Sequence, residues 1–162
     1  RGELDATGAV DDGKNLLYRL NLAYQDQGGF RDFTNYQTTF VAPSLTFKLG
    51  EGTRLTLNYE YLRANFRDDD VYPNAREFLN VPRRRYFGEP QLEDNEYTGR
   101  LFSYEFTQAL NRDWQFRQSL SILNQQSENQ GVSLLGLQDD RQTLDRTFRR
   151  STNDIENFSI QA

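Results

Sequence analysis

The sequence predicts an all-β fold: a segment of an antiparallel transmembrane β-barrel with about seven strands. Apolar and polar residues alternate with a period of two along most of the chain. The connections between these alternating segments are short and long in strict turn. Aromatic residues gather near the ends of the apolar faces, where a barrel meets the membrane surface. No segment has the apolar spacing of an amphipathic helix.

The expected strands follow one another from the N-terminus. A weak one, ELDATGAV, precedes a clear one that reads LLYRLNLAYQD from Leu16. The next two read TTFVAPSLTFKLG and TRLTLNYEYL, and then come RLFSYEFTQAL and WQFRQSLSILN. A weaker strand ends at FSIQA. In the clear strands one set of alternate positions is apolar, as at Leu20 and Leu22, and the other is polar, as at Arg19 and Asn21.

The connections predict which end of the sheet faces outward. Three are expected to be tight turns: VDDGKN with Asp-Gly at its centre, LGEGT and NRD. Three are expected to be long loops: Gln27 to Asn35, Ala64 to Glu96, and Ser127 to Asp140. Their alternation puts every tight turn at one end and every long loop at the other. Short periplasmic turns and long extracellular loops are typical of outer-membrane barrels.

A soluble β-sandwich would show the same alternation, so other features favour the barrel. The alternating segments run to roughly ten residues, whereas strands of globular proteins usually have about five or six. A loop of about thirty residues is unusual in a compact soluble domain. The aromatic residues expected near the strand ends on the apolar face are Tyr24, Phe47, Tyr59, Tyr61, Phe102 and Trp114.

Composition excludes several classes of function. The chain has no His and no Cys, which removes the commonest general base and metal ligands, and we expect no enzyme. A net charge of -5 gives no reason to expect nucleic acid as a partner. A mean hydropathy of -0.86 is compatible with a barrel, because half of its strand residues face water. The chain has no Met and begins at Arg1, so we expect a piece of a longer protein.

Several motifs occur along the chain in a specific order: RGELDATGAVDDGKNLLYRLN, VAPSLTFKL, TRLTLNYEYL, FLNVPRRRYFGEP, NRDWQFRQSL and GLQDDRQTLDRTFRRS. Their order and spacing resemble the barrel of TonB-dependent siderophore receptors, over essentially the whole chain. The resemblance implies a barrel of about 22 strands closed by an N-terminal plug domain. Residues 1–162 would then be a partial barrel, without the plug, the TonB box and the remaining strands.

The resemblance also implies a function. Such a receptor lies in the outer membrane of a Gram-negative-type bacterium, contacts its lipid, and takes up ferric siderophores with energy from the TonB-ExbB-ExbD complex. That complex acts through the N-terminal part absent here. Iron enters as the ferric-siderophore ligand, so no cofactor and no metal ligand are expected. A passive porin-like barrel and a soluble β-sandwich binding module remain the alternatives, and the motifs do not identify the siderophore.

Candidate ligand-binding residues lie in the expected extracellular loops. Arginine offers forked donors to carboxylate or hydroxamate oxygens, and aromatic faces can cover a chelate. The candidates are Phe30, Phe33, Tyr36, Tyr72, Arg83, Arg84, Arg85, Tyr86 and Phe87. In the alternative interpretation, which we favour for Arg83 and Arg85, the arginines pair with Glu89, Glu93 or Asp94 and brace their own loop.

Charged residues on the polar side of the strands are expected to face the lumen. They would pair with the plug or with each other across strands, and would not bind ligand. These residues are Arg19, Arg54, Glu60, Glu105 and Arg117.

Overall fold

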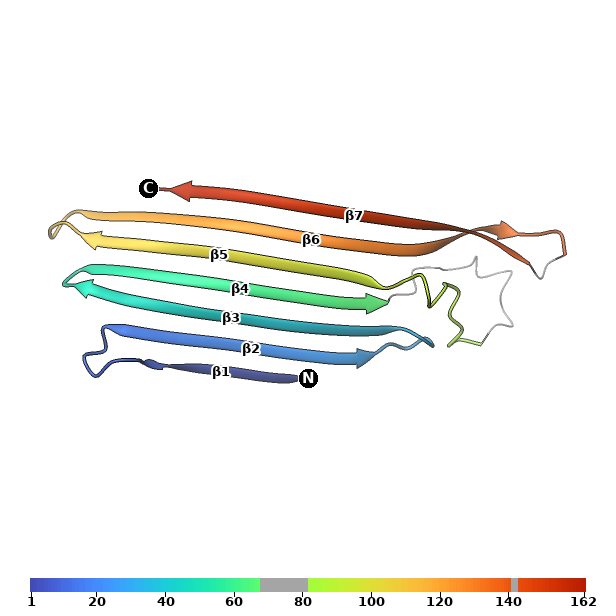
Figure 1. Cartoon of the computed structure of the whole chain (residues 1–162), viewed down its shortest axis with the longest axis horizontal. Helices are drawn as coiled ribbons and strands as arrows, with labels where there is room; N and C mark the ends of the chain where they lie inside the picture. The colour runs from blue at the N-terminus through green and yellow to red at the C-terminus, as the bar shows by residue number, and fades with distance from the viewer. Residues whose placement is uncertain (68–81, 141–142) are drawn as a thin grey trace.

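The computed structural model describes residues 1–67, 82–140 and 143–162. In this part of the chain seven antiparallel strands form one sheet in chain order (Figure 1). The strands are β1 Gly2–Ala9, β2 Leu16–Gly28, β3 Asn35–Gly50, β4 Thr53–Arg67, β5 Asn95–Ala109, β6 Gln115–Leu137 and β7 Leu144–Gln161. The predicted all-β fold with seven strands is confirmed. Within the described residues there is no helix that could cross a membrane.

The strand register sorts side chains into rows of one character that cross the whole sheet. Directly paired residues of neighbouring strands point to the same face. One such row is polar: Thr7, Arg19, Ser44, Asn58, Ser103, Ser121 and Ser159. The adjacent row is apolar or aromatic apart from one glycine: Gly8, Tyr18, Leu45, Leu57, Tyr104, Leu120 and Ile160. The sheet therefore has one polar and one apolar face, as the alternation predicts.

No second layer covers the apolar face in the described part of the chain. The buried hydrophobic residues there are only Ala64, Tyr86 and Val132. Large apolar side chains of the strands are exposed instead, among them Leu4, Tyr24, Phe102, Ile122 and Phe158. A β-sandwich would bury such a face against another sheet. A continuous exposed apolar face is what a lipid-facing barrel wall requires.

The apolar band ends at a defined height on the outer face. Along β6 it includes Phe116 and Ile122, and the same face then continues with Asn124. Asn124 lies in one row with Arg100 of β5 and Glu156 of β7. From Phe116 to Asn124 the strand is about 26 Å long at roughly 3.3 Å per residue, and with the usual tilt of about 35–45° it spans about 20 Å of the ~25 Å apolar band of outer-membrane barrels. The loop-side parts of β5, β6 and β7 therefore extend beyond the membrane.

The predicted loop at Ser127 to Asp140 is wrong for most of its length. Strand β6 continues to Leu137, and pairs such as Glu128 with Thr152 and Gln130 with Arg150 extend its ladder with β7. Beyond the apolar band both faces of a strand meet water, so the alternation of polar and apolar residues disappears although the backbone pairing persists. The sequence signal for a strand therefore ends before the strand does.

The three short connections lie at one end of the sheet and the loops at the other, as predicted (Figure 1). Glycine supplies the positive φ of the β3–β4 turn, with Gly50 at 146° and Gly52 at 76°. The β1–β2 turn differs from the expected Asp-Gly hairpin, because its left-handed residue is Lys14, with φ 53°. That turn is instead closed by Asp11, whose carboxylate accepts the N–H of Leu16 at 2.7 Å.

We expect the contribution of Asp11 to stability to depend on pH. The hydrogen bond from the Leu16 N–H holds the pKa of Asp11 below its ordinary value of 3.8. Its stabilisation is therefore fully present above about pH 4 and is lost as pH falls through the lower pKa of the folded state. Asp11→Asn should be less stable than the wild type near neutral pH, and this difference should shrink in acid. Thermal unfolding of both proteins from about pH 3 to pH 7 measures it, and a constant difference would contradict the assignment.

Candidate functional site

The motif PRRRYFGEP lies against the loop end of the sheet. From the β2–β3 loop, Asp32 donates its N–H to the carbonyl of Arg84 at 2.9 Å. The guanidinium of Arg84 forms an ion pair with the Asp32 carboxylate at 3.1 Å. Phe33 meets the ring of Tyr86 edge-on, with centroids 6.1 Å apart. These contacts join two loops that are separated by strands β3 and β4.

A buried carboxylate, Glu93, fastens the motif to β6. Its side chain accepts the hydroxyl of Tyr86, the N–H of Glu89 at 2.7 Å and the N–H of Val132 at 2.6 Å. Glu93 is only 4% exposed. Gly88 leaves room for it, because a Cβ at that position would collide with the Glu93 carboxylate. The glycine of the G-E-P part of the motif is therefore explained by the passage of this carboxylate.

The other two acidic residues of the loop are engaged by strand residues. Arg146 of β7 pairs with Glu89 at 3.4 Å and donates to the carbonyl of Gly88 at 3.2 Å. Arg67 of β4 pairs with Asp94 and also donates to the carbonyl of Phe33. Glu89, Glu93 and Asp94 thus hold the loop, but their partners are not the arginines of the motif. The alternative prediction that paired them with Arg83 to Arg85 does not match these contacts.

The arginines and aromatics of the motif lie in different environments. Arg83, Arg84 and Arg85 are exposed, and only Arg84 has an ion-pair partner among the described residues. Tyr86 is buried with its hydroxyl on Glu93, and Phe87 is half-buried.

The aromatic residues predicted to bind ligand outside the motif also lie in different environments. Phe30 and Phe33 are exposed in the β2–β3 loop, and Phe33 has a φ of 66°. Tyr36 lies in β3 and not in a loop, with its ring 6.0 Å from that of Phe66. Tyr72 lies outside the described residues.

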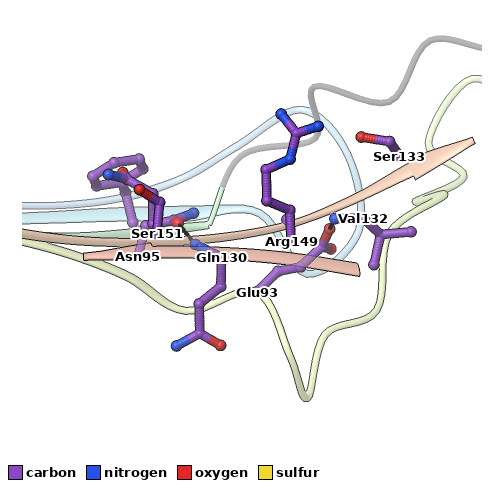
Figure 2. A pocket seen from close by; sticks show the side chains of 10 residues that line it. Glu93, Asn95, Gln130, Val132, Ser133, Arg149 and Ser151 are labelled. Atoms are coloured by element: carbon purple, nitrogen blue, oxygen red, sulfur yellow. Dashed lines mark hydrogen bonds between the residues drawn. The ribbon is translucent and has the colours of Figure 1, made fainter. Parts of the chain in front are cut away.

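A pocket of about 270 Å³ lies beside the Glu93 anchor (Figure 2). Seven of its ten lining residues are polar, and the lining comes from β4, β5, β6, β7 and the loop before β5. The lining residues are Phe66, Glu93, Asn95, Asn129, Gln130, Gly131, Val132, Ser133, Arg149 and Ser151. Asn129, Gly131 and Ser133 have the same parity on β6 as Ser121, and they therefore belong to the polar face of the sheet.

Sequence reasoning did not single out Arg149, which lines this pocket. It lies in the run Phe148 to Thr152, FRRST, where no alternation marks which side chains face inward. The register gives adjacent arginines opposite faces: Arg149 pairs with Gly131 on the polar face, and Arg150 pairs with Gln130 on the outer face. Arg150 also forms an ion pair with Glu128 at 2.6 Å. Only the long β6–β7 ladder could have separated their roles.

The residues expected to face the lumen lie on the polar face. Arg19 pairs across strands with Asp5 at 2.8 Å, and Arg117 pairs with Glu105. Arg54 lies opposite Lys48 and Thr107 in the register, and Glu60 lies opposite Leu101. Their contact with a plug domain stays a prediction.

No family model matches the sequence. The curated relatives are the metal-pseudopaline receptor CntO from two strains of Pseudomonas aeruginosa. The receptor of strain UCBPP-PA14 is 30% identical over 151 residues, which cover 92% of this chain and 21% of the relative. The receptor of strain PAO1 is 33% identical over 119 residues, covering 72% of this chain and 17% of the relative. The chain spans about a fifth of the length of these relatives.

Solved structures share the arrangement of the strands. The ferripyoverdine receptor of the Pseudomonas aeruginosa outer membrane, bound to ferripyoverdine, aligns with a TM-score of 0.83 at 19% identity, over 98% of this chain and 22% of that one. The ferric-catecholate import receptor Fiu from Escherichia coli K12, in its closed form, aligns with a TM-score of 0.73 at 19% identity, over 95% and 24%. At this identity the likeness establishes the fold.

Proposed function

Because this chain is a β-barrel segment of a TonB-dependent outer-membrane receptor, we propose that the intact protein imports metal chelates of the siderophore type. The observation that carries the proposal is the 30% identity to a metal-pseudopaline receptor over 92% of the chain. The fold is compatible with it, since an apolar outer face, a polar inner face and strands that rise beyond the apolar band form the wall of such a receptor.

The ligand in this proposal is the whole chelate, with iron or another metal already bound. The protein then needs to recognise organic groups and not the bare ion, which agrees with a sequence that has no His or Cys. We place the outer ligand contacts on the exposed residues of the loop end, Phe30, Arg83 and Arg85. The role is transport and not catalysis, and the TonB-ExbB-ExbD complex supplies the energy through the N-terminal part of the protein.

Several of the predicted site residues are held by contacts within the protein, and we propose structural roles for them. Tyr86 and Glu93 are buried against β6 and support the outer loop. Arg19 and Arg117 are engaged by Asp5 and Glu105 on the inner face. We propose that these ion-paired residues of the inner face hold the barrel wall and the plug domain together. That assignment leaves Arg83 and Arg85, which have no ion-pair partner among the described residues, for the ligand.

The test is uptake of radioactive metal by cells that carry the full-length receptor. Ferripyoverdine and metal complexes of pseudopaline serve as probes. We expect saturable uptake of at least one probe, lost when TonB is deleted. Uptake that persists without TonB would support a passive pore instead. If the purified receptor bound none of these probes in a titration, the proposal would be overturned for these chelate classes.

A further inference from the structure

Arg149 presents a guanidinium to the pocket of Figure 2 without a protein partner among the described residues. Its direct neighbour across the ladder is Gly131, which has no side chain. In Figure 2 the guanidinium points away from the carboxylate of Glu93. That carboxylate accepts three donors, the Tyr86 hydroxyl and the N–H groups of Glu89 and Val132. The cation in the pocket is therefore not neutralised by the one acidic residue that lines it.

The groups around Arg149 suit an anionic oxygen ligand. Ser151 and Ser133 provide hydroxyl groups, and Asn129 provides an amide. The Asn95 side-chain oxygen accepts the N–H of Gln130 at 2.6 Å, so its amide nitrogen remains as a donor on that side. Phe66 forms an apolar wall, and its ring lies 6.0 Å from that of Tyr36. A forked cation with hydroxyl and amide donors matches the geometry of a carboxylate.

Gly131 keeps this space open. A Cβ built on Gly131 would meet no atom within 4 Å, and its φ is not in the left-handed region. A larger residue would therefore fit the backbone, yet it would fill the pocket opposite Arg149. Neither a turn nor backbone strain requires a glycine at this position.

We propose that this pocket binds a carboxylate-bearing arm of the imported chelate, with Arg149 as its main contact. The inference rests on the proposed function and adds to it a site and a chemical group. At about 270 Å³ the pocket is slightly smaller than the usual range of about 300–1,000 Å³ for small-molecule sites. It accommodates one arm of a chelate, while the rest of the ligand lies above it toward the exposed loop arginines.

The test uses the full-length receptor and the probe that it binds best among ferripyoverdine and the pseudopaline complexes. Arg149→Gln should weaken Kd about 10- to 100-fold, because a charge-assisted hydrogen bond to the ligand is lost. It should also flatten the dependence of Kd on salt, since one ionic contact is removed. Arg149→Lys keeps the charge but loses the forked guanidinium, so its Kd should lie between those of the wild type and Arg149→Gln. Arg112→Gln, in the β5–β6 turn at the opposite end of the sheet, is the matched control and should bind like the wild type.

A second variant tests the pocket without touching the charge. Gly131→Leu should weaken Kd at least tenfold by filling the space, while Gly28→Leu, another loop-end glycine with open space at its Cβ, should not. The shift between folded and heated mobility in an SDS gel checks that each barrel is intact. Wild-type affinity in Arg149→Gln, or in Gly131→Leu, would overturn the inference and leave the proposed function standing. Absence of binding by the wild-type receptor would overturn the proposed function itself.

Discussion

Glu93→Ala is expected to release residues 82–94 from the sheet while the barrel stays folded. The substitution removes the acceptor of three hydrogen bonds, from the Tyr86 hydroxyl and the N–H groups of Glu89 and Val132. Tyr86 and Val132 are themselves buried, so water does not easily replace the carboxylate. Each buried donor left without a partner costs about 1–3 kcal/mol. We therefore expect these losses to outweigh the remaining contacts of this short surface segment.

Hydrogen exchange measured by mass spectrometry gives the readout. In Glu93→Ala, peptides covering 82–94 should lose protection by at least a hundredfold, and the amide of Val132 should become faster than its neighbours on β6. Peptides of β2 and β3 should not change, because their ladder does not involve the loop. Glu96→Ala is the control, since it removes a half-exposed carboxylate that pairs with Arg63 at 2.9 Å. Equal protection in Glu93→Ala and Glu96→Ala would refute the anchor.

A second variant tests whether displacing the Glu93 carboxylate has the same effect on the loop as removing it. Gly88→Ala keeps Glu93 but introduces a Cβ where the carboxylate lies. It should reproduce the loss of protection at 82–94, although no hydrogen-bonding group has been removed. Gly88→Ala with normal protection would mean that the loop can accommodate Glu93 elsewhere.

The fold could be predicted because its main determinant is local. Alternation at Arg19, Leu20 and Asn21 reports directly which side of a strand meets lipid and which meets water. The same determinant explains where prediction fails. From Asn124 to Gln130 the outer face of β6 is polar as well, so the alternation no longer carries information, and the predicted strand ends about ten residues before β6 does.

The loop contacts could not be read from the sequence because they join distant segments. Charge alone suggests that Glu93 pairs with the nearby arginines, whereas the fold brings it to the backbone N–H of Val132. Arg149 and Arg150 are chemically identical neighbours, and only the register with β6 sends one into the pocket and the other to Glu128. Residues 82–87 were correctly expected in an outer loop, but which of them stay exposed depends on the strands beneath them.

Leu120→Arg is expected to destabilise the barrel by about 2–4 kcal/mol. Leu120 lies on the apolar face of β6, midway between Phe116 and Asn124. Its row contains Tyr104 on one side and Ile160 on the other, with no carboxylate to pair with an arginine. In transmembrane barrels an arginine on the lipid face costs that much near the midplane and about 0–1 kcal/mol near the surface.

Gln126→Arg, on the same face of the same strand, is the matched control. Gln126 lies beyond the apolar band, in a row with Thr98 and Asp154. An arginine there meets water and a neighbouring carboxylate, so we expect a change of less than about 1 kcal/mol. Urea titrations of the full-length receptor in lipid vesicles, followed by the mobility shift of the folded barrel, measure both variants.

The difference between these two variants also tests the environment of the sheet. If the apolar face met water, Leu120→Arg would replace an exposed apolar side chain with a soluble one, and both substitutions would have similarly small effects. A cost that is large at Leu120 and small at Gln126 requires a medium that changes from hydrocarbon to water between these positions. The depth at which the cost falls would locate the membrane surface on β6, and with it the part of the strand that extends beyond the membrane.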